Sequence, residues 1–438
     1  MEEKVVKPTF REAFMFWCRL GWISFGGTTG HIAIMHDFLV DQKKWISNSK
    51  FLHALNHCMV LPGPEAQQLA IYIGWKLHGK KGGITAGTLF VLPSMFILLA
   101  LSMIYVLYGN IPWVLAMFSG MKPAVIAIIL IATYKVGQKA LHGVLHYFVA
   151  AMAFVATYFF HLSMIPIIAG TITLAIIIRY LHPSLLHVKN KHIQEDKNEH
   201  LYYLNKHSSD AGHVFKTKTV LKQLGVFVLI WLLPFGLFIL FLTDFHFWRD
   251  MGLFFTQTAF VTIGGSYTVI PYVAQFSVTK LQWLSKVQMI DGFALAETTP
   301  GPLIIVLSYV GFMAGYNHFN ESLLMGTAGL LATTYFTFLP SFMFIFVGAP
   351  FIEKTQGKLT IESILSLVTA TVVGVIMNLT FYLGKDILFP HGVALSKLDL
   401  IALIWVIISL VLIQRFKINI LLLILLSIVY GLVHHFLI

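Results

Sequence analysis

Glycine and proline break four apolar segments of the chain, in two matching pairs. Proline cannot continue a helix on its N-terminal side, yet it fits the first turn of a new one. Each break is therefore expected to open a half-helix, whose free N–H groups and dipole make an anion site. The alternative is kinks tolerated by packing, or surface loops; recurrence in both halves favours the anion site. The breaks are Gly26-Gly27, Pro62-Gly63-Pro64, Gly264-Gly265 and Pro300-Gly301-Pro302.

Two carboxylates flank the Pro-Gly-Pro breaks. Glu297 lies in the apolar stretch Phe293–Thr299, directly before the second break, and Met59 takes its place at the first. An ionisable residue inside an apolar segment is costly, so Glu297 is the clearest candidate for a proton carrier or a gate. The alternative is a carboxylate that caps local backbone N–H groups. Glu65, directly after the first break, has a role in coupling or merely caps the helix that begins there; the residue types leave both open.

Basic side chains near the breaks offer further contacts to an anion. Arg19 carries a planar guanidinium that suits a tetrahedral oxyanion; the alternative is that it reaches the membrane surface near Arg11. Lys122, next to Pro123, has a weaker claim because it is expected at the end of a span. Histidines near the first-half breaks are more often hydrogen-bonded packing groups than ligands. They are His31, His53 and His57.

The segments that must position these residues are strongly apolar. Of 438 residues, 57% are hydrophobic and 11% are charged, whereas soluble domains have about 25% charged residues. Apolar runs that approach the roughly 20 residues of a membrane-spanning helix recur along the chain. The sequence therefore predicts an all-α polytopic membrane protein in a lipid bilayer. Examples of these runs are Gly87–Leu107, Val114–Ile131, Leu224–Leu242 and Ile401–Ile413.

Charge and cysteine content argue against several other classes. The net charge is +11, but most Lys and Arg fall in loops between spans, so no nucleic-acid partner is expected. The acidic start of the chain does not resemble a cleaved signal. The two cysteines, Cys18 and Cys58, lie in apolar segments and fit packed thiols better than a disulfide framework.

The chain contains an internal repeat. Residues 25–64 align without gaps on residues 263–302 at a constant offset of 238, and later segments match at an offset of 247. Such gapless agreement favours a real duplication. The matched anchors are Gly26-Gly27 with Gly264-Gly265, Trp45 with Trp283, the two Pro-Gly-Pro breaks, Pro93-Ser94 with Pro340-Ser341, and Gly137 with Gly384.

Loop charges predict that the two halves have opposite orientations. Lys76, Lys80 and Lys81 follow the first Pro-Gly-Pro break and indicate a cytoplasmic loop, whereas the matching loop at 316–321 lacks Lys and Arg. Two inverted repeats of about six helices each, with broken half-helices and an extra linking span, are typical of secondary transporters and give about thirteen spans. The expected division is a first repeat at 1–181, a polar cytoplasmic linker at 182–222, the extra span at 223–244 and a second, inverted repeat at 245–438, with a cytoplasmic N-terminus.

Neither a metal nor a cofactor is predicted. The linker contains several histidines, but their irregular spacing and the lack of a cysteine or carboxylate pattern favour a solvated segment over a metal-sensing loop. Gly79-Lys80 lacks the glycine-rich lead and the following Ser or Thr of a P-loop. With no haem-ligand pair, glycine-rich fingerprint or acidic metal motif, the chain is not expected to be an enzyme.

Taken together, these residues resemble the chromate ion transporter family in its long-chain, two-domain form. The ordered set of motifs covers nearly the whole chain except the linker, which makes the resemblance specific. In the first half the matching stretches are Phe25–Gly27, Gly30–Ile32, Leu61–Gln68, Gly74-Trp75, His78-Gly79 and Gly87–Ser94. In the second half they are Phe254–Gln257, Gly264-Gly265, Leu295–Pro302, Val310–Phe312, Thr337–Ser341, Gly348–Pro350 leading to Glu353, and Val372–Asn378.

The resemblance implies a plasma-membrane protein that exports chromate, confers chromate resistance and draws on an ion gradient rather than ATP. Sulfate, a tetrahedral dianion of similar size and charge, is implied as another substrate of the family. One departure concerns the Gly-Gly breaks, where the family pattern has proline as the next residue. Thr28 stands there in this chain, with Ser266 in the second copy. Both add hydroxyl groups that suit an oxyanion.

The sequence therefore predicts a secondary transporter of a small inorganic oxyanion, with the half-helix ends at its centre. Hydroxyls of Thr28, Thr298 and Thr299 are expected to join the backbone donors, Arg19 to add positive charge, and Glu297 to carry a proton or gate the pathway. A passive anion channel, or a transporter of a different small anion, is the alternative. The coupling ion stays open, as does a homodimer, since no span shows a seam of small residues beyond the breaks.

Overall fold

The computed structural model describes residues 7–25, 27–181, 199–205, 217–263, 268–348, 359–390, 392 and 394–437. Every regular element in these ranges is helical, and the strand-like pairing in them is one isolated bridge between Ile46 and Leu204. The predicted all-α fold is confirmed.

The first half opens with short helices and continues with long ones. Helix α1 (Phe10–Ile23) begins in a capping box, in which Thr9 and Glu12 satisfy each other's backbone N–H groups. Helix α3 is capped by the Ser47 side chain. The elements are α1, α2 (Gly27–His36), the π-helical η1 (Asp37–Gln42), α3 (Asn48–Val60), α4 (Glu65–Tyr108), α5 (Pro112–Ala140), α6 (Val144–Tyr158) and α7 (Met164–Leu181).

Helix α4 is a hairpin of two arms rather than one rod. His78 (φ −134°, ψ 24°) and Gly79 (φ 64°, ψ −160°) leave helical geometry, and the chain reverses there. The arms then pack together at two glycines, where a Cβ on Gly82 would lie 2.2 Å from the carbonyl oxygen of Gly74. Only glycine permits so close an approach. The half-helix that follows the first Pro-Gly-Pro break is thus short, and a longer helix returns beside it.

The second half has a similar order of elements. After η3 (Glu199–Leu201) comes α8 (Thr217–Phe241), at the position of the predicted extra span. Ser285 caps α11 as Ser47 caps α3, 238 residues earlier. The elements are α9 (Phe245–Val261), α10 (Ile270–Gln275), the π-helical η5 (Phe276–Lys280), α11 (Lys286–Glu297), η6 (Leu303–Ile305), α12 (Val306–His318), α13 (Leu323–Met343), η7 (Phe344–Gly348), α15 (Leu359–Leu388), η8 (Leu395–Lys397), α16 (Leu400–Gln414) and α17 (Ile420–Leu437).

A second tight hairpin joins α12 to α13. A Cβ on Gly329 of α13 would lie 2.1 Å from the carbonyl oxygen of Gly311 in α12. Both Pro-Gly-Pro breaks therefore lead into a short helix, a sharp turn and a longer returning helix with glycines at the contact.

Seven helices in the described part of the chain are long and apolar enough to cross a membrane, namely α4, α5, α7, α8, α13, α15 and α17. Three shorter apolar helices accompany them: α6, Leu303–His318 and α16. This is fewer than the expected thirteen or so spans. One physical reason is that α4 counts once although its two arms reverse at His78-Gly79. Another is that each break divides an apolar segment into pieces, such as α3 and α11, that are shorter than a span.

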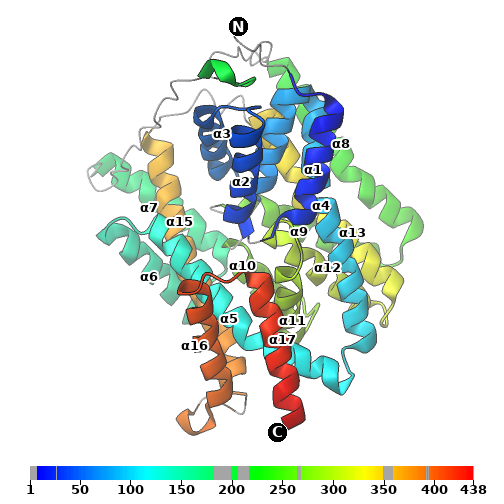
Figure 1. Ribbon diagram of the computed structural model, residues 1–438, viewed down its shortest axis with the longest axis vertical. Helices are drawn as coiled ribbons and strands as arrows, with labels where there is room; N and C mark the ends of the chain where they lie inside the picture. The colour runs from blue at the N-terminus through cyan, green and yellow to red at the C-terminus, as the bar shows by residue number, and fades with distance from the viewer. Residues whose placement is uncertain are drawn as a thin grey trace.

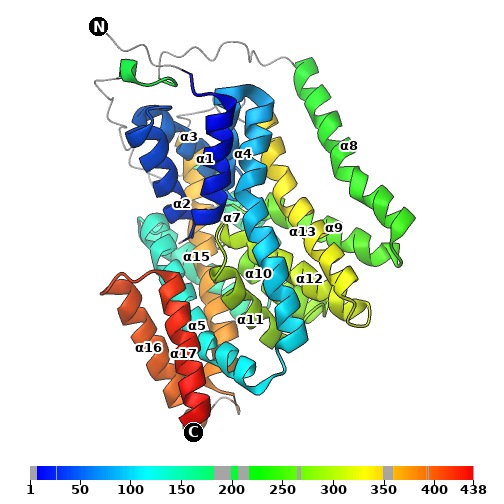
Figure 2. The same ribbon diagram turned by 45° about the vertical axis from the view of Figure 1, so that its right-hand side comes forward.

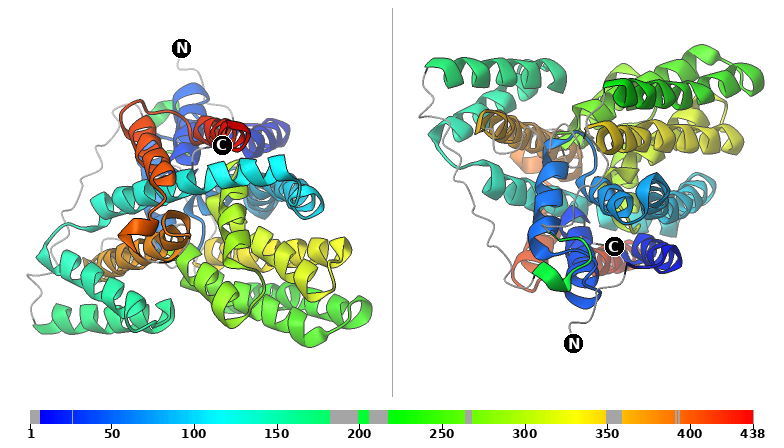
Figure 3. Two further views of the ribbon diagram at one scale, coloured as in Figure 1. Left: turned by 90° about the horizontal axis from the view of Figure 1, so that it is seen from below. Right: turned by 90° about the horizontal axis from the view of Figure 1, so that it is seen from above.

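Helix α8 shows the kind of surface that a bilayer requires. Its outward residues include Leu229, Leu240 and Phe241, with exposed fractions of 70%, 73% and 76%. Apolar side chains exposed in such continuous stretches belong in lipid rather than in water. Figure 3 shows α8 at the periphery, where it packs against α13. The predicted polytopic membrane protein is confirmed at this level.

The two halves interlock instead of forming separate bodies. Helix α4 of the first half contacts α11, α12 and α13 of the second, and α5 contacts α11, α15, α16 and α17. The N-terminal helices α1 to α3 gather at one end of the molecule and α17 reaches the other, so the termini lie at opposite ends (Figure 1). Figure 2 shows α11 well away from α3, toward the end where the chain finishes.

Candidate functional site

The two Pro-Gly-Pro breaks are fastened to each other's half of the chain. The N–H of Gly63 donates to the carbonyl oxygen of Thr262 (2.7 Å), and the N–H of Gly301 donates to that of Ser24 (2.6 Å). Ser24 and Thr262 end α1 and α9 and are 238 residues apart, as are the two glycines. Both glycine amides have a backbone acceptor in this structure, so they are not among the free donors of the breaks.

Only glycine fits at the centre of each break. Gly63 and Gly301 have φ of +113° and +98°, which side chains rarely adopt. A Cβ on Gly301 would lie 1.9 Å from Ser94 Oγ, and one on Gly63 would lie 3.1 Å from Ser341 Oγ. Both serines are buried, and their hydroxyls have no hydrogen-bond partner among the described residues. Pro62, Pro64, Pro300 and Pro302 complete these turns.

Backbone N–H groups without a helical acceptor remain directly after each break, where each half-helix begins. In α4 the first helical hydrogen bond runs from Gln68 N–H to Pro64 carbonyl oxygen (3.0 Å), and in η6 from Ile305 N–H to Pro302 (2.9 Å). The amides before these, at residues 65–67 and 303–304, belong to the first turn, which lacks intrahelical acceptors. They are the donors that an anion could use.

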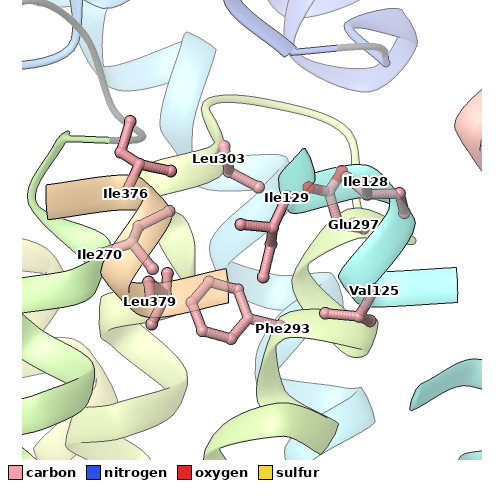
Figure 4. A pocket seen from close by; sticks show the side chains of 9 residues that line it. All are labelled: Val125, Ile128, Ile129, Ile270, Phe293, Glu297, Leu303, Ile376 and Leu379. Atoms are coloured by element: carbon pink, nitrogen blue, oxygen red, sulfur yellow. The ribbon is translucent and has the colours of Figure 1, made fainter. Parts of the chain in front are cut away.

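A small pocket lies at the start of the second half-helix (Figure 4). Glu297 ends α11 and is the one ionisable residue among the described residues that line the pocket. The wall thus combines residues from both halves of the chain, with the helix start at residue 303 in it. The lining is Val125, Ile128 and Ile129 of α5, Ile270 of α10, Phe293 and Glu297 of α11, Leu303 of η6, and Ile376 and Leu379 of α15.

The predicted threonine donors do not all point to this pocket. The hydroxyls of Thr298 and Thr299 donate to the carbonyl oxygens of Leu295 (2.6 Å) and Ala296 (2.7 Å). They finish the last turn of α11, so their protons are not available to an oxyanion in this conformation. Thr28 is half-buried in the first turn of α2, after Gly27 with φ +72°.

Arg19 requires a correction. It lies on the exposed face of α1, whereas Phe16, Trp17 and Leu20 make the buried face. It therefore does not bring positive charge to the centre, and the surface alternative fits. Glu65 is the first residue of α4 and only partly buried, and it is not among the residues that line the pocket. Gly26, Gly264 and Gly265 lie outside the described residues.

The three histidines make contacts of the packing kind. His31 is fully buried, and its Nε2 donates to the carbonyl oxygen of Ser24 (2.9 Å), the atom that also accepts from Gly301. His57 Nδ1 donates to the carbonyl oxygen of His53 (2.7 Å). Among the described residues, no group of three or more His, Cys, Asp or Glu could hold a metal ion.

One charged cluster was not predicted from the sequence. Asp291 of α11, 3% exposed, lies 3.6 Å from Lys122 Nζ and accepts a hydrogen bond from the Tyr105 hydroxyl (2.9 Å). The sequence marks Lys122 as a candidate contact but does not indicate its partner. The available signal was an aspartate inside an apolar stretch, six residues before Glu297.

Comparison with known proteins identifies a family to which this chain is similar. The sequence model of a family described as chromate transporter matches residues 11–177 and 249–432. A probable chromate transport protein of Synechococcus elongatus is 27% identical over 407 residues, which is 91% of each chain. A chromate transport protein of Cupriavidus metallidurans is 27% identical over 400 residues, 90% of this chain and 88% of that one.

A shorter relative matches about half of the chain. The uncharacterized transporter YwrB of Bacillus subtilis is 30% identical over 203 residues, which is 46% of this chain but 95% of the relative. A protein of about half the length thus aligns almost completely. No solved structure matches this chain significantly.

Proposed function

The chain belongs to the chromate transporter family, and we propose that it exports chromate, or a related oxyanion such as sulfate, across the plasma membrane with the energy of an ion gradient. The family is one of transporters, not enzymes. Support for the substrate comes from the two relatives named as chromate transport proteins, which align over about nine tenths of the chain.

The proposed architecture is a pair of inverted repeats. Its support is the reciprocity of the bonds from Gly63 and Gly301, each to the opposite half. The π-helical segments repeat as well, since Trp45 N–H donates to Leu39 and Trp283 N–H to Ser277, both pairs offset by 238. The alignment of YwrB over about half the chain agrees with a duplicated unit. Such repeats support alternating access to a central site.

The single observation that carries the transport site is the pocket that holds both Glu297 and the start of the half-helix at Leu303. Its other lining residues are apolar and provide no positive side chain. A tetrahedral dianion there would rely on first-turn amides and the helix dipole, as anions do at many helix N-termini. The walls from α5, α11 and α15 come from both halves, so movement between the halves would open or close the pocket.

Glu297 gives the pocket a means of coupling. A dianion and an ionised carboxylate in one small apolar space repel each other strongly. Binding of the anion and ionisation of Glu297 therefore oppose each other, which ties substrate occupancy to a proton on that residue. The same repulsion would allow the carboxylate to act as a gate that leaves when the anion arrives.

Flux in everted vesicles tests this function. Vesicles that contain the protein, with the cytoplasmic face outward, should accumulate labelled chromate when a pH gradient is imposed. Glu297→Gln should abolish the dependence on the gradient, because the amide can neither carry nor release the proton. Glu321→Gln, a change of an exposed carboxylate in the turn before α13, is the matched control.

The outcomes separate the claims. Gradient-driven uptake that persists in Glu297→Gln would keep the transporter but remove Glu297 as its coupling residue. Uptake that never saturates and never exceeds equilibrium would indicate a channel. If chromate does not move while labelled sulfate does, sulfate is the substrate of this chain.

A further inference from the structure

A buried ion pair joins the two halves beside the pocket. Lys122 Nζ of α5 lies 3.6 Å from Asp291 Oδ1 of α11, and the two side chains are 22% and 5% exposed. The hydroxyl of Tyr105, near the end of α4, donates to the other carboxylate oxygen at 2.9 Å. Lys122 and Tyr105 belong to the first half of the chain, and Asp291 belongs to the second. These three residues, here called the latch, therefore bind one half to the other.

Packing within the second half of the chain fixes the position of the Asp291 carboxylate. Gly292, next to Asp291, faces the Tyr309 ring of α12 so closely that a Cβ would lie 2.2 Å from it. Tyr309 is fully buried, and its ring meets that of Tyr105 edge-on at 5.9 Å between centroids. Helix α11 thus has little freedom at this level, and Asp291 is held against Lys122.

Along both α5 and α11, the latch residue precedes the residues that line the pocket. Along α5, the pocket residues Val125 and Ile129 follow Lys122 by one and two turns. Along α11, Glu297 follows Asp291 by six residues, about 9 Å at the helical rise. The pocket therefore begins where the latch ends. The side that the latch closes is that of the α4–α5 junction, which lies at the opposite end of the molecule from the N-terminus (Figure 2).

Charges of this kind are not retained for stability alone. A buried ion pair is often no better for stability than apolar residues of similar size, but loss of one partner leaves a buried charge uncompensated. Ionisable residues inside membrane segments are rare and mark ion pathways or moving parts. The internal repeat does not reproduce the latch. The positions that match Lys122 and Asp291 in the other half are Thr369 and His53, which cannot form a lysine–carboxylate pair.

We propose that Lys122, Asp291 and Tyr105 form the external gate of the transporter, closed in this structure, and that the gate opens by separation of Lys122 from Asp291. This inference rests on the proposed transport function and on a cytoplasmic N-terminus, which makes the α4–α5 side external. Because the matching positions, Thr369 and His53, cannot form such a pair, the latch biases the protein toward the state in which the external side is shut.

Thiol labelling tests the gate without any substrate. Cys18 and Cys58 are first replaced by alanine, and Leu379→Cys places a reporter in the pocket wall on α15, away from the latch. A membrane-impermeant thiol reagent is then added to the external face. Asp291→Asn and Lys122→Met should each speed labelling about tenfold or more, since either leaves a buried charge unpaired and favours separation. The exchanged pair, Lys122→Asp with Asp291→Lys, should restore slow labelling.

Two comparisons keep the result interpretable. Lys286→Met removes a lysine from a second lysine–aspartate pair, with Asp386 at 2.8 Å, whose carboxylate is half-exposed. Neither residue lines the pocket, so this variant should leave labelling unchanged. Tyr105→Phe removes one hydrogen bond only and should speed labelling less than Asp291→Asn does; it also serves if the charge variants do not fold. Each variant is checked for a single monodisperse species before labelling.

A cross-link gives a second, independent measurement. Lys122→Cys with Asp291→Cys, joined by a short cleavable bifunctional reagent, should lower chromate flux about tenfold and recover it on cleavage, because transport requires the gate to open. Equal labelling of the reporter in all folded variants, or full flux through the cross-linked protein, would overturn the proposal. If labelling responds as expected while no oxyanion moves, the gate stands and the proposed substrate does not.

Discussion

Alanine at the two central glycines should affect the protein unequally, although the breaks look alike in sequence. At Gly301 the φ of +98° is unfavourable for alanine, and the new Cβ would lie 1.9 Å from Ser94 Oγ and 3.0 Å from Ser94 Cβ. At Gly63 the φ of +113° is also unfavourable, but the overlap is milder, because the nearest atom is Gln68 Nε2 at 2.8 Å, at the end of a longer side chain that donates to the Pro62 carbonyl oxygen. Both sites therefore have backbone strain, and the steric overlap is more severe at Gly301 than at Gly63.

The magnitudes follow from these two terms. A positive φ costs alanine roughly 1–2 kcal/mol relative to glycine, and overpacking of a rigid site adds about 1–3 kcal/mol. Gly301→Ala should thus lower the free energy of unfolding by about 2–5 kcal/mol, and Gly63→Ala by about 1–2 kcal/mol. Ser94→Ala removes the clashing oxygen. In the double variant Gly301→Ala with Ser94→Ala, about 1–2 kcal/mol of the loss should return as a coupling energy between the two sites.

The assay is unfolding of the purified protein from mixed micelles by increasing fractions of a denaturing detergent, for the wild type, the three single variants and the double variant. Chromate flux on the same proteins shows whether the break also matters for transport. Equal losses in Gly301→Ala and Gly63→Ala would refute the clash argument. A double variant that is simply additive would show that Ser94 is not the group that excludes a side chain at position 301.

Two further predictions concern residues outside the pocket. Arg19→Gln should leave chromate flux within about twofold of wild type, because Arg19 lies on the exposed face of α1 and exposed substitutions usually have small effects; a complete loss of flux would return Arg19 to the site. A hydrogen bond from His318 (2.8 Å), with one from the Phe247 N–H, holds the pKa of Asp244, at the start of α9, below its ordinary value. The carboxylate should therefore stabilise the fold above its unfolded pKa of about 3.9 and lose that effect as pH falls through the lower folded pKa; Asp244→Asn, which keeps the cap, should flatten this acid dependence in unfolding curves.

Features that depend on neighbouring residues could be predicted from local sequence patterns. The apolar runs predicted membrane helices, and the Pro-Gly-Pro breaks predicted half-helices that begin near residues 65 and 303. Glu297 stands next to a break in the sequence, so its place at the end of α11, close to the half-helix that begins at Leu303, followed from adjacency. The exposed position of Arg19 was also predictable, because Ala13, Phe16, Trp17 and Leu20 form an apolar stripe that excludes it.

Other features depend on partners that are distant in sequence. Asp291 meets Lys122 and Tyr105 across about 170 to 190 residues of chain, a contact that neither periodicity nor composition encodes. The residue types of Thr298 and Thr299 suit ligand donors, yet their hydroxyls donate to the backbone at the end of α11. Hydroxyls of Ser and Thr commonly bond to nearby backbone in this way, and the choice between helix end and ligand is made by the local turn.

The reciprocal bonds of the breaks also constrain how the protein can move. The N–H of Gly301 donates to Ser24 at the C-terminal end of α1, and the N–H of Gly63 donates to Thr262 at the C-terminal end of α9. Each half therefore binds the break that precedes the half-helix of the other half. If both hydrogen bonds persist, one half can only rotate relative to the other about the line that joins the two bonds. A translation of one half would break at least one of these bonds. The latch lies away from that line, on the side of the α4–α5 junction, where a rotation separates side chains most. We therefore expect the two breaks to act as the pivot and the pair of Lys122 and Asp291 to part first, so that the cross-link at the latch should stop flux.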